Sequence, residues 1–178
     1  MFQSPNLSLS DILGKDYTTA VARANEALGI MSYDDTMAVA DEKIDFYPQA
    51  KQIRNDEMLA KVGTQIMPAY DSNEPGAGTN SFMKATNTKM SPVTGFCNYR
   101  VGEDGKLYLL GKSEHYHAPL GHRFDGYKLI DNARKIGILN ATHNNTRGYI
   151  TRLMEKRIVE MANGIAWDDE AATQQVLA

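Results

Sequence analysis

The chain of 178 residues carries 19 lysines and arginines against 22 aspartates and glutamates, a formal charge of −3, which excludes a chain-wide positive field for nucleic acid. Its length corresponds to one ordinary domain or slightly more, and its hydrophobic residues (42%) suffice for a core but form no run of membrane-spanning length. The N-terminal residues lack the basic and apolar regions of a signal peptide, and the single cysteine cannot form an internal disulfide. We therefore expect a cytoplasmic protein that binds neither nucleic acid nor membranes.

Residues 1–67 predict a helical N-terminal extension. Its first clear helical face is formed by three apolar residues, Val21, Ala24 and Leu28. Gly29 is suited to end that helix, and Ser32 is a candidate N-cap because its hydroxyl can accept a hydrogen bond from a free backbone N–H. A third helix is expected to begin at Pro48 and to end at Gly63. Its apolar residues are Ile53, Leu59 and Val62.

Residues 68–94 are predicted to form a loop or linker. Turn-forming Asp, Ser, Asn, Pro and Gly dominate 71–78, and Thr, Asn and Lys are frequent in 80–91. A stretch of this length without regular structure is uncommon inside a compact domain. We therefore expect it to be functional, disordered or packed against another surface.

A β-hairpin is predicted at the start of the next segment, 95–164. Residues 96–101 and 106–110 are short β-prone runs, and Gly-Glu-Asp-Gly at 102–105 is typical of the turn between two such strands. Cys97 falls in the first run, where a lone cysteine is more often a small buried hydrophobic residue than a nucleophile.

Two amphipathic helices and the beginning of another are predicted after the hairpin. The first has an apolar face that ends at Gly137, formed by Leu129, Ala133 and Ile136. The second has an apolar stripe that ends at Gly164, formed by Ile150, Leu153, Met154, Ile158 and Met161. We expect this stripe, methionines included, to pack in the core. Residues 165–178 begin with an acidic turn and stop without a helix-ending signal, which predicts the start of a truncated helix.

Three of the four histidines, His115, His117 and His122, lie close together after the hairpin. On an extended strand His115 and His117 point to the same side, so with His122 or Glu114 they could bind zinc or iron. The sequence has no established ligand spacing, however, and hydrogen bonding in a turn accounts for these imidazoles as well. A small metalloenzyme that uses the three histidines remains an alternative hypothesis. A nucleophilic pair of Cys97 with one of them has less support.

The fourth histidine lies in a polar loop, 140–148, before a predicted helix. Hydrogen-bond donors at a helix N-terminus suit an anionic group such as a carboxylate or a phosphate. The surrounding segment, 123–157, holds eight basic and three acidic residues, which indicates either an anion-steering surface or a solvated helix face. A non-enzymatic binding module that uses this basic surface and the 68–92 loop is a second alternative.

The residues of these two loops resemble the early part of class III pyridoxal-phosphate-dependent aminotransferases. The shorter elements of the resemblance are Gly-Glu-Asp-Gly-Lys-Leu-Tyr at 102–108 and Pro-Leu-Gly-His at 119–122. A subgroup of that family has a Lys-Ser-Glu-His-Tyr-His-x-Pro-Leu-Gly-His block similar to 112–122. It also has an Asn-Ala-Thr-His-Asn-Asn-Thr-Arg-Gly block similar to 140–148. The match covers roughly 95–164, and the two long blocks are its most specific part.

The resemblance implies the aspartate-aminotransferase fold, which is fold type I of the pyridoxal-phosphate enzymes, usually as a homodimer. The chain would be an α+β fragment: the small-domain helices and a short antiparallel hairpin of an α/β protein, truncated before the large domain. The whole enzyme would transfer an amino group between an amino donor and a keto acid or aldehyde, with pyridoxal 5′-phosphate as cofactor. In the family the phosphate-binding turn and the Schiff-base lysine come later, so this chain alone would be inactive and no catalytic residue is carried over.

Only an active-site mouth is carried over to this sequence. The resemblance implies that Leu120, Gly121 and His122 lie near the substrate entrance. It implies a second group near the dimer interface and the active-site mouth, formed by His143, Asn144, Asn145, Thr146 and Arg147.

Overall fold

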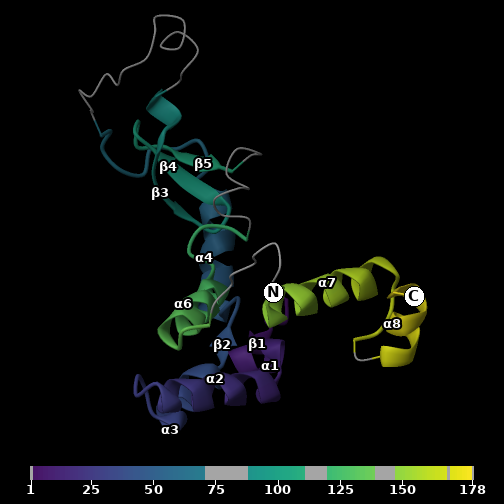
Figure 1. Ribbon diagram of the computed structural model, residues 1–178. Helices are drawn as coiled ribbons and strands as arrows, with labels where there is room; N and C mark the ends of the chain where they lie inside the picture. Colours follow the sequence, from purple (N-terminus) through teal and green to yellow (C-terminus); the bar gives the residue numbers. More distant parts are fainter. Residues whose placement is uncertain (1, 71–87, 111–119, 139–146, 168, 178) are drawn as a thin grey trace, which may run out of the picture. The chain divides into compact units, whose positions relative to one another are not determined.

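The computed structural model describes residues 2–70, 88–110, 120–138, 147–167 and 169–177, which form a mixed helix and sheet structure (Figure 1). The chain divides into two units, each described by itself. Unit 1 consists of Met1–Asn6 and Asp45–Tyr127, and unit 2 of Leu7–Ile44 and Lys128–Ala178. Each unit therefore combines segments distant in the sequence, and the units do not coincide with the four consecutive segments that the sequence predicts.

A three-stranded antiparallel sheet forms the centre of unit 1. Its strands are β3 (Pro92–Phe96), β4 (Tyr99–Gly102) and β5 (Leu107–Leu109), in that order, and helix α4 (Gln49–Leu59) lies beside it (Figure 1). In the described part of the unit, the 3-10 turn η1 (Thr88–Met90) precedes β3 and the 3-10 turn η3 (Asp125–Tyr127) lies at the end of the unit. The short strands β1 (Asn6–Leu7) and β2 (Ile44–Asp45) pair where the chain passes from one unit to the other.

The predicted hairpin is confirmed as β4 and β5, with Tyr99 opposite Leu109. Its turn is closed by the carboxylate of Asp104, which accepts hydrogen bonds from the backbone N–H of Lys106 at 3.0 Å and from the hydroxyl of Tyr108 at 2.6 Å. The Tyr108 hydroxyl, the largest influence, holds the pKa of Asp104 below its usual value. Local hydrogen bonds of this kind explain why turn chemistry alone could locate the hairpin.

The first strand of the sheet was not expected from the sequence. Phe96 pairs with Tyr99, so Cys97 and Asn98 form a two-residue loop, and the prediction of one continuous strand over 96–101 is wrong. The predicted loop 68–94 likewise extends too far, because β3 begins at Pro92. Pro92 and Gly95 weaken the β signal that Val, Thr and Phe give to this strand, and pairing with β4 stabilises it.

The other side of the hairpin is covered by the segment that follows α4. Gln65 and Lys106 form an antiparallel bridge, and the backbone N–H of Leu107 donates to the carbonyl of Thr64 at 3.0 Å. The edge of β5 is thus paired and not left open. Gly105 (φ +78°) is part of this contact, and a Cβ there would lie 2.1 Å from the carbonyl oxygen of Met67, so glycine is required.

The core of unit 1 is small and lies on one face of the sheet. Tyr99, Val101 and Leu107 are buried, and Met58 of α4 and Met67 pack against them. The apolar residues that the sequence assigns to this helix, Ile53, Leu59 and Val62, are instead exposed. Helix α4 begins after Pro48, close to the predicted position, but it ends at Leu59 and not at Gly63, so the predicted end is wrong.

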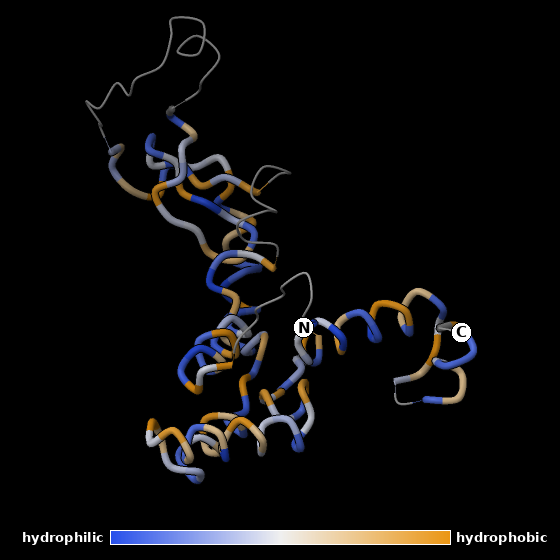
Figure 2. The backbone as a smooth tube through the Cα atoms, in the orientation of Figure 1, coloured by the Kyte–Doolittle hydropathy of each residue, from blue (hydrophilic) through white to orange (hydrophobic). Residues whose placement is uncertain are grey.

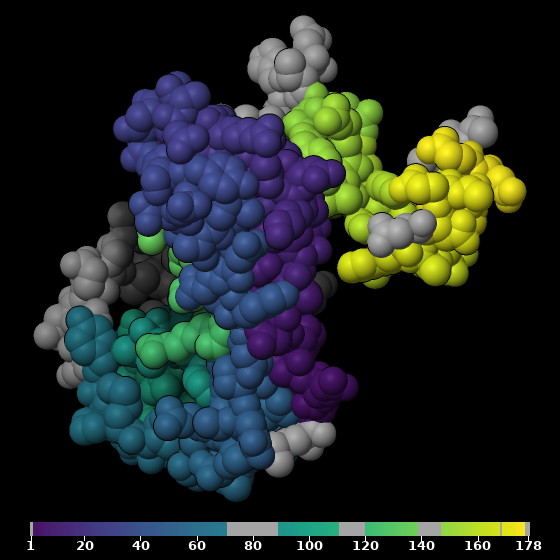
Figure 3. All heavy atoms as spheres, turned by 90° about the horizontal axis from the view of Figure 1, so that it is seen from below, coloured from purple at the N-terminus to yellow at the C-terminus, as the bar shows by residue number. Residues whose placement is uncertain are grey.

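Unit 2 is helical. Its helices are α1 (Leu9–Leu13), α2 (Lys15–Ala27), α3 (Tyr33–Ala40), α6 (Lys128–Lys135), α7 (Tyr149–Ala162) and α8 (Glu170–Leu177). The purple and blue atoms of α1, α2 and α3 pack closely together, and the yellow-green and yellow atoms of α7 and α8 contact one another (Figure 3).

Side-chain caps mark the starts of helices α1 and α3 in unit 2. Ser32 caps α3 as predicted, because its hydroxyl accepts the backbone N–H of Asp35 at 3.1 Å. Ser8 and Asp11 form a capping box at α1 in which each side chain bonds the backbone N–H of the other. The ammonium of Lys43, followed by the groups of Ser8, lowers the pKa of Asp11 to about 2.

The buried face of α2 differs from the predicted one. Thr18, Ala22 and Asn25 are buried, whereas Leu28 is 71% exposed. The side-chain amide of Asn25 donates at 2.9 Å to the carbonyl of Ile136, which satisfies a buried polar group just after α6. Small and polar residues therefore form this contact, and hydrophobic spacing alone points to another face.

The predicted buried face of α6 is confirmed, and the predicted buried face of α7 is wrong. Leu129 and Ile136 are buried, and the chain turns at Gly137 (φ +73°). On α7 the predicted core stripe is largely exposed, with Met154 54% and Met161 69% accessible, and hydrophobic segments alternate with polar ones along this helix (Figure 2). The buried residues of α7 consist instead of one polar side chain, Glu160.

The acidic turn near residue 168 does precede a helix, α8, which contacts α7. Glu160 is fully buried there and accepts hydrogen bonds from Arg157 at 2.8 Å and from the hydroxyl of Thr173 at 3.3 Å. Among the described residues, no helix is both long enough and apolar enough to cross a membrane.

Candidate functional site

The two groups of residues assigned to an active-site mouth have different outcomes. Leu120, Gly121 and His122 belong to unit 1, and Leu120 and His122 line a pocket there. In the second group, residues 143–146 lie outside the described residues. Arg147 is exposed and forms an ion pair with Glu155 of α7. The pocket of unit 1 is therefore the candidate site.

A short antiparallel bridge fixes His122 against the sheet. The backbone N–H of Cys97 donates to the carbonyl of His122 at 2.9 Å, and the N–H of His122 donates to the carbonyl of Cys97 at 2.7 Å. Gly121 (φ +87°) permits this approach, because a Cβ there would come within 3.0 Å of the Cys97 carbonyl oxygen. A Cβ on Gly95 would overlap the His122 ring, at 2.2 Å from Cδ2. Both glycines are thus required by the position of the histidine.

Two residues at this bridge have an unusual backbone conformation. Cys97 (φ +49°) and Arg123 (φ +57°) are the non-glycine residues with positive φ among the residues described. Cys97 occupies the first position of a two-residue hairpin loop, where glycine is commonly preferred. Strained conformations of this kind persist where surrounding contacts enforce them, and they cluster at ligand-binding and active sites.

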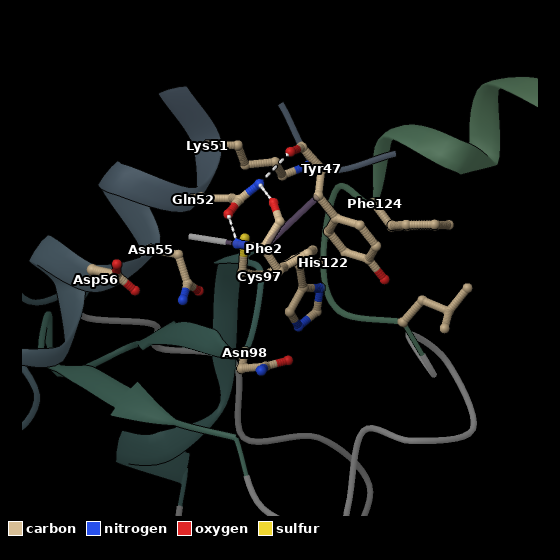
Figure 4. Close-up of a pocket in the computed structure, with 11 residues that line it drawn as sticks. Phe2, Tyr47, Lys51, Gln52, Asn55, Asp56, Cys97, Asn98, His122 and Phe124 are labelled. Atoms are coloured by element: carbon tan, nitrogen blue, oxygen red, sulfur yellow. Dashed lines mark hydrogen bonds between the residues drawn. The ribbon is translucent and has the colours of Figure 1, made fainter. Parts of the chain in front are cut away.

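The pocket has a volume of about 730 Å³, within the range of small-molecule sites (Figure 4). Helix α4 and the residues before it supply one wall, the β3–β4 loop supplies the floor, and the turn at 120–124 supplies the rest. The lining residues are Phe2, Tyr47, Lys51, Gln52, Asn55, Asp56, Cys97, Asn98, Leu120, His122 and Phe124.

Two polar side chains of α4 are engaged within the pocket wall. The ammonium of Lys51 forms an ion pair with Asp125 at 2.6 Å and also donates to the carbonyl of Arg123. The amide of Gln52 donates to the carbonyl of Tyr47 at 2.8 Å and accepts the backbone N–H of Phe2 at 3.1 Å. These bonds hold the wall together and leave neither group available as a strong ligand contact.

Three polar groups of the lining are available to a ligand. Asp56 makes no ion pair with any described residue, and the side-chain amides of Asn55 and Asn98 have no hydrogen bond within the described part of the chain. Figure 4 shows Asp56 and Asn55 on the α4 side and Asn98 at the strand loop. The pocket therefore contains one available carboxylate and two amides.

Aromatic rings form the opposite part of the pocket. Phe124 is buried and packs on Tyr47, with ring centroids 5.1 Å apart, and Tyr47 packs on Phe2 at 5.2 Å. The thiol of Cys97 also lines the cavity, and burial, the main cause, raises its pKa. A neutral thiol is thus expected at pH 7, which speaks against a nucleophilic pair of Cys97 and His122.

Sequence reasoning missed the contribution of residues 47–56. Lys51 and Asn55, and likewise Gln52 and Asp56, are four residues apart on one side of a helix, but this pattern is equally typical of a solvated helix face. The pocket residues from the other segments are about 40 to 77 positions away in the sequence, so no local signal could connect them. Cys97 was expected to be a buried strand residue and instead lies half-buried in the loop.

The metal hypothesis is not supported by the described residues. Within them no group of three or more His, Cys, Asp or Glu side chains is placed to hold an ion. His115 and His117 lie outside the described residues and His122 lies within them, so the three-histidine set stays a prediction.

The predicted basic surface is largely paired with carboxylates. Arg123 belongs to unit 1, and the remaining basic residues belong to unit 2. The pairs within unit 2 are Lys128–Glu42, Arg134–Asp131, Arg147–Glu155, Lys156–Glu170 and Arg157–Glu160. Pairing weakens the positive field that an anion-steering surface needs.

Pyridoxal 5′-phosphate, which the resemblance implies, does not fit this pocket. A phosphate group requires cations or converging backbone N–H groups. The lysine of the pocket is already engaged by Asp125, and Asp56 adds negative charge. No catalytic step through the cofactor is derived from these residues.

Comparison of the chain with protein-family models, with curated protein sequences and with solved structures found no match.

Proposed function

We propose that the chain is the N-terminal region of a class III pyridoxal-phosphate-dependent aminotransferase. The observation that carries the proposal is the pair of long sequence blocks at 112–122 and 140–148, which resemble one subgroup of that family. The whole enzyme would be a cytoplasmic homodimer that transfers an amino group from an amino donor to a keto acid or aldehyde.

The position of one carried-over group supports this proposal. Leu120 and His122, which the resemblance assigns to the substrate entrance, both line a cavity of ligand size. The turn that holds them is fixed to the β3–β4 loop through Cys97. A fixed, partly apolar turn suits a role in guiding a substrate, whereas proton transfer and cofactor binding would belong to residues elsewhere.

The proposal is tested first on the chain alone. Incubation with pyridoxal 5′-phosphate followed by borohydride should give no stoichiometric adduct on a single lysine, since no described lysine is held in a cofactor site. A single modified lysine at full occupancy would contradict the assignment.

The second test uses the gene. Its reading frame is expected to continue into a Gly/Ser/Thr-rich phosphate turn and a later lysine. In the encoded enzyme, His122→Asn should raise the KM for the amino donor and leave the cofactor absorbance unchanged. A reading frame without these features would refute the proposal.

A ligand-binding module without enzymatic activity is the second candidate. The observation that favours it is that all eleven lining residues of the pocket belong to unit 1. Such a module would bind its ligand without any cofactor, which separates it experimentally from the first proposal.

A further inference from the structure

We propose that the pocket of unit 1 binds a small organic cation, with its ammonium group beside Asp56 and its apolar or aromatic body against Tyr47 and Phe124. The proposal does not rest on the aminotransferase assignment, because it involves no cofactor and no residue outside this pocket.

The charges of the pocket favour a cation. Lys51 is only 13% exposed and its ammonium is neutralised by Asp125 at 2.6 Å. The Cys97 thiol is uncharged at pH 7 because burial raises its pKa. Asp56, an exposed residue that lines the cavity, therefore remains as the carboxylate without a described ion-pair partner. A ligand with a carboxylate or phosphate would be repelled by Asp56 and would find the lysine already paired.

The hydrogen-bonding groups match an ammonium ion. The side-chain oxygens of Asn55 and Asn98 can accept N–H bonds, and neither amide has a described partner that competes. A charge-assisted bond to Asp56 would be the strongest of these contacts. Each of the three side chains can therefore accept an N–H bond from a cationic ligand in the pocket.

The apolar part of the cavity determines the rest of the ligand. In Figure 4, Asp56 and Asn55 lie on one side and the rings of Tyr47 and Phe124 on the other, with His122 between. Aromatic rings bind planar or apolar groups and attract cations through their electron-rich faces. This separation of carboxylate and rings suits a ligand whose charge and ring stand a few bonds apart.

The test is calorimetric titration of the whole chain with four related probes. They are 2-phenylethylamine, its trimethylammonium analogue, the neutral 2-phenylethanol and the anionic 3-phenylpropanoate. The two cations should bind at least about tenfold more tightly than the neutral probe, and the anion should bind least, since the loss of one charge-assisted contact costs about that factor. A preference for the primary amine indicates that hydrogen bonding dominates, and equal binding of both cations indicates that charge and rings suffice.

Matched variants locate the site. Asp56→Asn should weaken binding of 2-phenylethylamine about tenfold, because it keeps the shape and removes the charge. Glu57→Gln is the control: it removes the same charge from the next position of α4, and that side chain is exposed and does not line the pocket. Equal effects of both variants, or tighter binding of the anionic probe, would overturn the proposal.

The single cysteine gives an independent measurement. Cys97 lines the cavity, so bound 2-phenylethylamine should slow its reaction with a thiol reagent, and the neutral probe at the same concentration should slow it less. Unchanged reactivity at saturating amine would place binding elsewhere and refute the assignment. This thiol measurement does not depend on transamination. A negative result would therefore refute amine binding in the pocket and would leave the aminotransferase proposal to be tested separately.

Discussion

Replacing Glu160 by glutamine removes one negative charge from the contact between α7 and α8. The carboxylate is fully buried, accepts a hydrogen bond from Arg157 at 2.8 Å, and lies 3.7 Å from the ammonium of Lys156. The hydroxyl of Thr173 donates to it from α8 at 3.3 Å. Glutamine has nearly the same shape and can still accept one of these bonds, so the variant isolates the contribution of the charge.

The expected loss of stability is about 2 kcal/mol, the value of a hydrogen bond between charged groups. Full removal of a buried partner can cost about 3–5 kcal/mol. Here the cost is smaller because Arg157 and Lys156 are 23% and 25% exposed and can regain water. Lys156 also keeps its second carboxylate partner, Glu170.

Urea unfolding followed by tryptophan fluorescence measures this loss. Trp167 is the only tryptophan of the chain, and the guanidinium of Arg157 lies 4.5 Å from the centre of its ring. Glu155→Gln is the control, since that carboxylate is on the same helix but pairs with the exposed Arg147 and should cost about 0.5 kcal/mol or less. Equal losses in the two variants would show that burial of Glu160 contributes nothing.

Three further changes test other parts of the structure. Gly95→Ala should destabilise unit 1 by about 1–3 kcal/mol and displace the ring of His122, because the added Cβ would lie 2.2 Å from that ring. Unchanged NMR shifts of the histidine would disprove this contact. Gly105→Ala should cost more, about 2–4 kcal/mol, because the added Cβ would lie 2.1 Å from a rigid backbone carbonyl and φ is +78°. Urea unfolding ranks the two glycine variants by their loss of stability, and the reverse order would contradict the geometry. The pKa of Asp11 is lowered to about 2 in the folded state, so its contribution to stability is complete above the unfolded value near 4 and is lost as the pH falls from about 4 to 2. The carboxylate is about one-third exposed, which limits this contribution to about 1 kcal/mol. Unfolding free energies of the wild type and Asp11→Asn should therefore converge toward pH 2, and parallel pH profiles would refute the assignment.

The candidate site could be predicted only in part. The Leu120–Gly121–His122 turn was selected from its sequence block; Leu120 and His122 line the pocket, and the assignment of the turn to a substrate entrance stays a prediction. Asp56 and Tyr47 could not be identified, because a charged residue on a short helix or an aromatic residue just before it has the same local pattern whether it faces solvent or a cavity. Residues 143–146 lie outside the described structure, and their assignment to an active-site mouth remains a prediction.

The hairpin turn and some of the helix boundaries were determined by the sequence itself. The Ser32 cap, the stop at Gly29 and the Asp104 turn involve hydrogen bonds or dihedral angles within about four residues, so their signals are local. The buried faces were decided only by the tertiary structure. Thr18 and Ala22 are buried while Leu28 is exposed, because burial depends on which helix lies opposite and not on hydrophobicity alone. Strand β3 and the pocket were likewise decided only by the tertiary structure, since both depend on contacts outside the local sequence pattern.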